Sequence, residues 1–292
     1  MPKTAIIVLN WNGRDCLPAC LLSLQSISYR DKEIIVVDNG SSDDSLAIAK
    51  CDFPHCLFIE NGTNLGFAGG MNRGIRTALE RGAEYVWLFN SDAQAKPDTL
   101  TTLIEVAKIH PEAGLFSPII TNSNGQTWFA KGRIDFLRMR ALHTEPSPRE
   151  LTSPAYESQF LTGCALLIQK KALEKAGFLD ERFFLYYEDA DLCLRAANYG
   201  FQSLVVPKAR VMHAEKSREN PEKTYYLVLS GLLFSAKHAP RLLRPYLAGY
   251  ATIRRLKNRL DLLCGRDKAE AVARAYRDFD RYANPSLLDR HR

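Results

Sequence analysis

Four short apolar segments alternate with helix-like segments along the first third of the chain, and this alternation restricts the possible folds more than any other feature. The apolar segments cover residues 5–9, 33–37, 57–59 and 85–89. Short β-branched or aromatic runs of this kind are typical of strands buried on both faces of a parallel sheet. Because strands that alternate with helices form βαβ units, we predict an α/β fold with a mostly parallel sheet flanked by helices.

Polar residues follow the predicted strands where the strands end. Asn10, Asp38 and Asp92 come shortly after such segments, and Gly66 lies in the loop after the third one. In open α/β sheets the carboxyl ends of the strands face one crevice, and ligands bind there. Turns favour Asn, Asp and Gly in any case, but that preference explains one or two positions more easily than all four. We therefore predict that these residues meet at one binding site.

An acidic stretch follows a run of aromatic residues late in the chain. Glu188, Asp189 and Asp191 open a helical pattern that stops at Gly200, and the helix macrodipole favours carboxylates at this end. Asp191 can reach Arg195 one turn further on, which leaves Glu188 and Asp189 without a local basic partner. Such a carboxylate can take a proton from a hydroxyl group. The alternative is that Asp189 only caps the helix and the tyrosines before it belong to the core.

The remaining segments have a weaker periodic signal. We predict a helix over residues 97–108, strands over 115–120, 160–168 and 202–206, and basic helices from residue 225 onward. The strand over 160–168 contains Gly163, which indicates close approach of another group to the backbone. Between residues 131 and 158 the periodicity breaks down, and prolines mix with basic residues. This pattern predicts a long, partly mobile loop.

Composition limits the class of protein. With 292 residues, 46% of them apolar, the chain can bury one large core with an appendage. Its seven cysteines are odd in number and lack zinc-site spacing, which favours reduced thiols over a disulfide framework. No apolar run approaches the length of a membrane span, and no signal peptide precedes the first predicted strand. We therefore expect a cytoplasmic protein.

Positive charge is concentrated at the end of the chain. Residues 238–292 carry 13 Lys and Arg against 6 Asp and Glu, a net charge of +7, whereas the whole chain carries +6. The apolar stretch 225–234 followed by basic residues resembles a segment that lies on an anionic membrane, on the inner face of the cell membrane in this case. Alternatively, it packs on the rest of the chain or on a partner subunit, which leaves a homo-oligomer open. We do not expect nucleic-acid binding, because the basic residues come without a recognised binding module.

Five segments in a fixed order resemble the motif set of family 2 glycosyltransferases, which have the GT-A fold. Within that family the rhamnosyltransferase-like branch is the most similar. The segments are residues 8–13 (VLNWNG), 36–43 (VVDNGSSD), 64–70 (NLGFAGG), 90–92 (NSD) and 187–195 (YEDADLCLR). The resemblance covers roughly residues 4–217. It implies a catalytic domain over residues 1–220, with a Rossmann-like nucleotide-binding half and an acceptor-binding half, and a basic helical extension over residues 221–292.

The resemblance implies a donor that carries a nucleotide diphosphate, either dTDP or UDP. Asp38 would accept the N3–H of a thymine or uracil ring, or else it caps the following turn. The residues implied at the donor nucleotide are Asn10, Asn12, Asp38, Gly66, Phe67, Ala68, Asn90 and Ser91.

The resemblance also implies a divalent metal, Mg²⁺ or Mn²⁺, on the diphosphate. The segment 90–92 replaces the DxD motif of the family, so Asp92 would bind the ion while Asn90 removes one acidic ligand. His213 matches a second ligand, and imidazole suits Mn²⁺ better than Mg²⁺. A lone histidine can equally be an ordinary core or surface residue.

In the implied reaction Asp189 removes the proton of an acceptor hydroxyl, which then displaces the nucleotide diphosphate in a single inverting step. Glu188 could share this role or hold the acceptor. The acceptor, a glycan or lipid-linked glycan, would contact Gly163, Cys164, Tyr187 and Glu188, and L-rhamnose from dTDP-rhamnose is the leading donor. Two alternatives remain: a nucleotidyltransferase, which would need a basic phosphate loop where only Arg14 is present, and a catalytically silent nucleotide-sugar-binding subunit.

Overall fold

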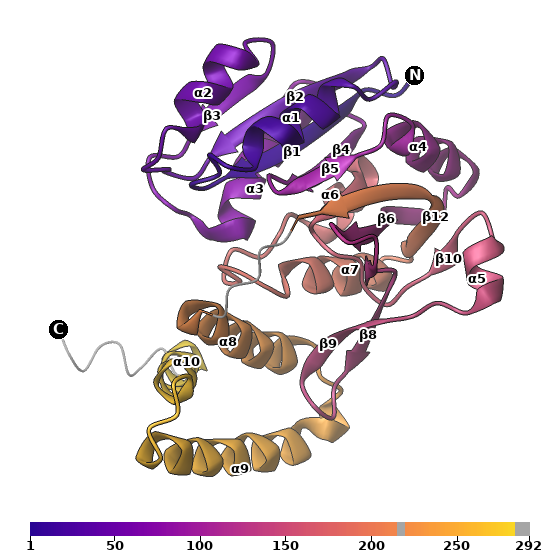
Figure 1. The fold of residues 1–292 in the computed structure, drawn as a ribbon. Helices are drawn as coiled ribbons and strands as arrows, with labels where there is room; N and C mark the ends of the chain where they lie inside the picture. Colours follow the sequence, from indigo (N-terminus) through magenta and orange to yellow (C-terminus); the bar gives the residue numbers. More distant parts are fainter. Residues whose placement is uncertain (215–219, 284–292) are drawn as a thin grey trace.

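The computed structural model describes residues 1–214 and 220–283 of the chain. A large twisted sheet with helices packed against it forms the N-terminal part, and three long helices lie beside it at the C-terminal end (Figure 1). The division of the chain into a catalytic domain over residues 1–220 and an extension over residues 221–292 stays a prediction. Position 217, where the predicted resemblance ends, lies outside the described residues.

The first four predicted strands are present. They are β1 (Thr4–Asn10), β2 (Lys32–Asp38), β3 (Leu57–Glu60) and β4 (Tyr85–Asn90), and they alternate with α1 (Leu17–Gln25), α2 (Ser45–Asp52) and α3 (Gly66–Glu80). β1 pairs in parallel with both β2 and β4, and β2 pairs in parallel with β3. The central strand β1 has its residues Ala5 to Val8 fully buried, because helices cover both of its faces.

The sheet continues beyond β4 with strands from the second half of the chain. Its order is β10-β12-β6-β11-β4-β1-β2-β3, with β6 (Ala113–Asn122), β11 (Ala165–Gln169), β12 (Gln202–His213) and β10 (Tyr156–Glu157). β11 runs antiparallel to β4 and β6, whereas β12 runs parallel to β6. The mostly parallel sheet is therefore confirmed. β12 extends past the predicted end at residue 206 and pairs with β5 (Ala93–Ala95), which places His213 opposite Ala93.

The predicted loop over residues 131–158 is wrong. β8 (Lys131–Asp135) and β9 (Arg140–Thr144) form an antiparallel hairpin, and α5 (Pro148–Thr152) follows it. The hairpin is only partly buried and therefore lacks the apolar run by which a strand is recognised in sequence. α5 begins at a capping box in which Ser147 and Glu150 satisfy each other's backbone N–H groups. The predicted strand over 160–168 was also too long, since β11 begins only at Ala165.

The remaining short elements complete the sheet domain. β7 (Thr127–Phe129) pairs with β6, and α4 (Thr99–Ile109), α6 (Lys170–Ala176) and α7 (Glu188–Asn198) pack against the sheet. α7 carries the predicted acidic stretch in its first turn. The acids therefore lie at a helix N-terminus, as predicted.

The C-terminal extension consists of α8 (Pro221–His238), a short 3₁₀ turn (Arg241–Leu243), α9 (Arg244–Leu263) and α10 (Ala269–Ala283). α8 buries Leu229, Leu232 and Phe234, and Phe234 stacks on Phe136 of the β8–β9 hairpin at 6.1 Å between ring centroids. The apolar stretch 225–234 thus packs inside the protein, which is the alternative considered above to its lying on a membrane. Within the described ranges, no helix has both the length and the apolarity needed to cross a bilayer.

Candidate active site

A cavity of about 390 Å³ brings together the acidic stretch, the end of β4 and the end of β12. It contains both Asp92 and Asp189, which are far apart in the sequence. The predicted site residues that line it are Phe67, Asn90, Asp92, Gly163, Cys164, Tyr187, Glu188, Asp189 and His213. A pocket with convergent ionisable groups is the natural place for a small-molecule reaction.

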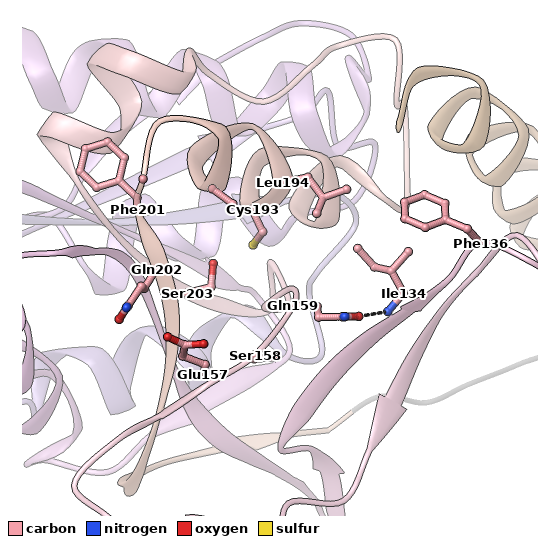
Figure 2. Close-up of a pocket in the computed structure, with 12 residues that line it drawn as sticks. Ile134, Phe136, Glu157, Ser158, Gln159, Cys193, Leu194, Phe201, Gln202 and Ser203 are labelled. Carbon is pink, nitrogen blue, oxygen red and sulfur yellow. Dashed lines mark hydrogen bonds between the residues drawn. The ribbon is translucent and has the colours of Figure 1, made fainter. Parts of the chain in front are cut away.

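A second cavity, of about 460 Å³, has a lining that comes mainly from α7, β12 and the β8–β9 hairpin (Figure 2). Cys193 and Leu194 of α7, Ser203 of β12 and Ile134 of the hairpin face it. Because its lining differs from the predicted site residues, the cavity that contains Asp189 is the candidate active site.

Asp92 and His213 form one wall of the candidate site. The β5–β12 pairing brings His213 Nε2 to 3.0 Å from Asp92 Oδ1. The His213 side chain is 5% exposed and that of Asp92 is 35% exposed, so the carboxylate keeps a free approach from the cavity. His213 Nδ1 is buried without a hydrogen-bond partner among the described residues, and the edge of Trp128 contacts the ring at 4.5 Å between centroids.

This pair fits a divalent cation whose coordination is completed by a ligand. It offers one carboxylate oxygen and one imidazole nitrogen, a mixed donor set that suits Mn²⁺. Residues 1–214 and 220–283 contain no cluster of three or more metal-binding side chains. An ion at Asp92 and His213 would therefore need further oxygens from water or from a diphosphate.

Asp189 and Glu188 line the same cavity. Tyr186 and Tyr187, just before α7, have φ values of 71° and 69°, a left-handed conformation that is rare for non-glycine residues. Asp189 Oδ2 accepts a hydrogen bond from the Gly163 N–H at 2.8 Å, and its Oδ1 accepts one from Ala190 N–H at 2.7 Å. The N-cap position of α7 is Tyr187, so Asp189 is not the N-cap residue.

The environments of the two acids affect their pKa values differently. Burial, together with the negative charge of Asp189, raises the pKa of Glu188 well above its ordinary value. Burial also raises the pKa of Asp189, but the hydrogen bonds from the Gly163 and Ala190 backbone oppose this rise. Glu188 Oε2 is buried without a hydrogen-bond partner among the described residues, so its ionisation is the more costly. Asp189 therefore ionises before Glu188.

At the ends of β1 and β2, where the nucleotide is predicted to bind, the side chains hydrogen-bond to one another. Asn10 and Asp38 are paired neighbours at the ends of β1 and β2, and Asn10 Nδ2 donates to Asp38 Oδ1 at 2.9 Å. Asp38 also accepts hydrogen bonds from the Gly40 and Ser41 N–H groups and from Ser41 Oγ. Its exposed fraction is 4%, and that of Asn10 is zero. The carboxylate thus caps the following turn, which is the alternative considered above, and the contact of Asn10 with a nucleoside stays a prediction.

Part of the predicted constellation lies away from the cavity. Asn12 Oδ1 accepts a hydrogen bond from the Ser42 N–H at 2.8 Å and so ties the loop after β1 to the turn after β2. Among the described residues that line the cavity we do not find Asn10, Asn12, Asp38, Gly66, Ala68 or Ser91. Asp38 lies at the same sheet edge, two strands from β4, and its meeting with Asp92 at one binding site stays a prediction.

The loop before α3 is hydrogen-bonded to two other segments of the chain, one around Phe184 and one around Asn39. Gly66 has φ +75°, and a Cβ atom there would lie 2.4 Å from the Phe184 carbonyl oxygen. The neighbouring Phe67 N–H donates to that same oxygen at 2.7 Å. On the other side, Asn39 Nδ2 donates to Asn64 Oδ1 and to the Gly66 carbonyl oxygen, at 2.8 and 3.0 Å. Asn39 had no predicted role, although it directly follows Asp38.

Replacement of Gly66 by Ala is expected to destabilise this contact. A left-handed conformation costs a non-glycine residue roughly 1–2 kcal/mol, and the clash with the Phe184 carbonyl adds to that cost. Gly62→Ala is a matched control, because Gly62 has φ +71° with nothing within 4 Å of its Cβ position. Thermal unfolding of both variants should show the larger loss for Gly66→Ala. Equal losses would contradict the proposed close contact between the two loops.

Several cavity residues had no predicted role. They are Trp128, Ala141, His143, Phe160, Thr162, Leu185, Tyr186, Lys223 and Leu227. Trp128 and His143 come from β7 and from the hairpin whose strands lack an apolar run, and Lys223 and Leu227 come from α8. The pairing of β7 with β6 and the packing of α8 bring them to the site, and no local sequence pattern marks either contact.

Comparison with known proteins agrees with this geometry. The sequence profile of Glycosyl transferase family 2 matches residues 5–177. The chain belongs to this family. It is therefore a glycosyltransferase, and the predicted resemblance is confirmed.

Two relatives within the family are rhamnosyltransferases. The chain is 27% identical over 229 residues to the N-acetylglucosaminyl-diphospho-decaprenol L-rhamnosyltransferase of Mycobacterium tuberculosis, covering 71% of this chain and 75% of the relative. It is 27% identical over 225 residues to the dTDP-rhamnosyl transferase RfbF of Shigella flexneri, covering 72% and 73%. These relatives support the rhamnosyltransferase-like branch of family 2.

A solved structure shares the fold. The mannosyltransferase PcManGT of Pyrobaculum calidifontis, in complex with GDP-Man and Mn²⁺, superposes with a TM-score of 0.60 at 16% identity. The match covers 99% of this chain and 79% of that one. The sheet of this family 2 member is thus the GT-A fold.

Proposed function

We propose that this family 2 member is a metal-dependent, inverting glycosyltransferase that moves a sugar from a nucleotide diphosphate to a hydroxyl of a glycan or lipid-linked glycan. The observation that carries the proposal is the cavity that contains both Asp189 and the Asp92–His213 pair. The rhamnosyltransferase relatives make L-rhamnose, carried by dTDP, the first sugar to test.

The donor would lie along the carboxyl ends of β2, β1 and β4. We propose that Asp38 and Asn10 order the turn after β2 rather than contact the base through their buried faces, and that Asn12 links this turn to the first loop. The backbone of Gly66, Phe67 and Ala68, with Asn90 and Ser91, would then line the path to the diphosphate. Small residues there permit close approach of the ligand.

Asp92 and His213 would hold Mg²⁺ or Mn²⁺ against the diphosphate. Such an ion neutralises the negative charge that develops on the leaving nucleotide. The contribution of this chain is to hold the two ligands 3.0 Å apart through the β5–β12 pairing.

Asp189 would act as the general base. Two backbone N–H groups, of Gly163 and Ala190, fix the orientation of its carboxylate. The acceptor hydroxyl loses its proton to Asp189 and attacks the anomeric carbon, so the bond to the nucleotide diphosphate breaks with inversion. Glu188 in its protonated form would donate a hydrogen bond to the acceptor, and Gly163, Cys164 and Tyr187 would line the acceptor side.

Ligand-induced stabilisation tests the donor half of this proposal. A ligand at about 100 times its Kd adds about 2.7 kcal/mol to the free energy of unfolding and so raises the melting temperature. We expect dTDP with Mn²⁺ to raise it more than dTDP alone, because the ion would hold the diphosphate against Asp92 and His213. Asp92→Ala should lose the Mn²⁺ increment, whereas Asp52→Ala, an exposed acid at the end of α2, should keep it. UDP and GDP measured in parallel would rank the bases. If the Mn²⁺ increment is the same in Asp92→Ala and the wild type, Asp92 does not bind the ion.

A further inference from the structure

One face of α9 is apolar and exposed to solvent. Its large side chains recur at intervals of three, four or seven residues, which places them along one side of a helix, and Leu242 of the preceding 3₁₀ turn adds to them. They are Leu242, Tyr246, Ile253, Leu256, Leu260 and Leu263, with exposed fractions of 93, 50, 67, 53, 63 and 84%. We call these six residues the α9 stripe. Exposed apolar patches of this kind mark interaction surfaces.

The opposite face of α9 is fixed to α10. Asn258 Nδ2 donates to the Ala269 carbonyl oxygen at 3.0 Å, and Arg255 forms an ion pair with Asp280 at 2.6 Å. The Arg255 guanidinium also lies 4.7 Å from the ring centroid of Tyr276. These contacts determine which side of α9 faces outward. Figure 1 shows α9 as the outermost helix of the extension, on the side away from the sheet.

Basic residues flank the stripe. Residues 241–260 contain six Lys and Arg and no Asp or Glu. Within the described part of the chain we find no acidic partner for Arg241, Arg244 or Arg259, whereas Lys257 pairs with Asp261. An apolar helical face with basic flanks is attracted to a lipid bilayer, which has an apolar interior beneath anionic headgroups.

We propose that the α9 stripe is a docking surface for an anionic lipid bilayer, with its leucines in the headgroup boundary and its arginines on the lipid phosphates. The same spacing also occurs in helix pairs, so a second copy of the chain is the competing occupant. The positive charge of the flanks distinguishes the bilayer from a second copy. Two copies would bring together flanks of the same sign without acidic partners, whereas an anionic bilayer neutralises them.

The docked helix is connected to the active site through the extension. α10 contacts α8, where Asp278 Oδ2 accepts from the Tyr225 hydroxyl at 2.8 Å and Arg274 pairs with Glu222 at 2.6 Å. α8 in turn contributes Lys223 to the wall of the cavity. A bilayer held at α9 would therefore be held at a fixed position relative to the cavity. This step rests on the proposed function and identifies a lipid-linked glycan as the acceptor class, whereas the docking itself does not depend on it.

Vesicle flotation of the full chain tests the apolar part of the surface. We expect flotation with vesicles of phosphatidylcholine and phosphatidylglycerol, and little with phosphatidylcholine alone. Leu256→Ser/Leu260→Ser should weaken binding at least tenfold, because two large apolar side chains leave the lipid. Leu22→Ser/Ile109→Ser removes two equally exposed side chains, 64 and 67%, from the sheet domain and should bind like the wild type. Equal flotation of both double variants would overturn the proposal.

The charged part has its own pair of variants. Arg241→Gln/Arg259→Gln should reduce binding roughly fivefold for each arginine lost, and added salt should weaken wild-type binding. The control Arg30→Gln/Lys108→Gln removes two charges from the sheet domain and should change little. A wild-type chain that forms a dimer through Leu256 and Leu260 in sedimentation experiments, and does not float, would overturn the proposal in favour of a second copy. The melting shift with dTDP and Mn²⁺, measured on the same variants, separates a failure of docking from a failure of the proposed function.

Discussion

Sugar transfer is expected to fall by a factor of roughly 10²–10⁴ when Asp189 is replaced by Asn, the contribution typical of a general base. The amide has nearly the same shape as the carboxylate, and its oxygen can still accept the hydrogen bond from the Gly163 N–H that is 2.8 Å long in the wild type. It cannot accept the proton of the acceptor hydroxyl. Donor binding should change little, because the Asp189 carboxylate is hydrogen-bonded to Gly163 and Ala190, whereas Asp92 is paired with His213. Transfer rates and the melting shift with dTDP and Mn²⁺ measure the two effects separately.

The neighbouring acid supplies the control for this prediction. Glu188→Gln removes a carboxyl group that ionises only after Asp189, so it should reduce transfer far less than Asp189→Asn. Because burial raises the pKa of Asp189, wild-type activity should rise with pH through a value above that of an ordinary aspartate. The reverse ranking of the two variants would make Glu188 the base. Activity of Asp189→Asn within a few fold of wild type would remove Asp189 from the role altogether.

The sequence was most informative where local pattern and burial agree. β1, β2 and β4 are runs of apolar residues because the sheet buries them on both faces, so their positions could be read directly from the chain. The acids of α7 were also placed correctly, since a stop at Gly200 and a carboxylate-rich first turn define a helix without reference to the rest of the fold.

Long-range contacts set the limit of prediction. The β8–β9 hairpin is held by the surface it covers: Gly132 lies so close to the Phe160 carbonyl that a Cβ would come within 2.4 Å. Nothing in residues 131–144 alone indicates that contact. Asp38 shows the same limit, because a carboxylate at a strand end is equally consistent with ligand binding and with turn capping. Only the four hydrogen bonds from Asn10, Gly40 and Ser41 distinguish the two.

The link between the catalytic domain and the extension depends on one buried carboxylate. Asp191 has a fully buried side chain, with Arg195 Nε at 2.7 Å, His238 Nε2 at 2.6 Å and Lys237 Nζ at 2.5 Å. Arg195 is the partner expected from the sequence, whereas Lys237 and His238 come from the last turn of α8. Arg195 also donates to the Phe178 carbonyl oxygen at 2.7 Å. Asp191 therefore joins α7, which carries the catalytic acids, to α8, which closes one side of the cavity.

Asp191→Ala is expected to lower the free energy of unfolding by about 3–5 kcal/mol, because the mostly buried Arg195 loses its carboxylate partner, whereas Lys237 keeps Asp180. Asp261→Ala is the matched control: Asp261 pairs with Lys257 and Arg266 on the exposed side of the extension, and its loss should cost less than about 1 kcal/mol. Urea unfolding of both variants measures the difference.

The same comparison has a pH dependence whose sign follows from Asp191. Burial alone would raise its pKa, but the hydrogen bond from His238, the charge of Arg195 and the hydrogen bond from Lys237 outweigh it and hold the pKa below the ordinary value of 3.8. The stabilisation is therefore fully present above pH 3.8 and is lost as the pH falls through the lower folded-state pKa. The gap between wild type and Asp191→Ala should be constant at neutral pH and close only in strong acid. A gap that closes already between pH 5 and 7 would contradict the assignment of this stabilisation to the Asp191 carboxylate.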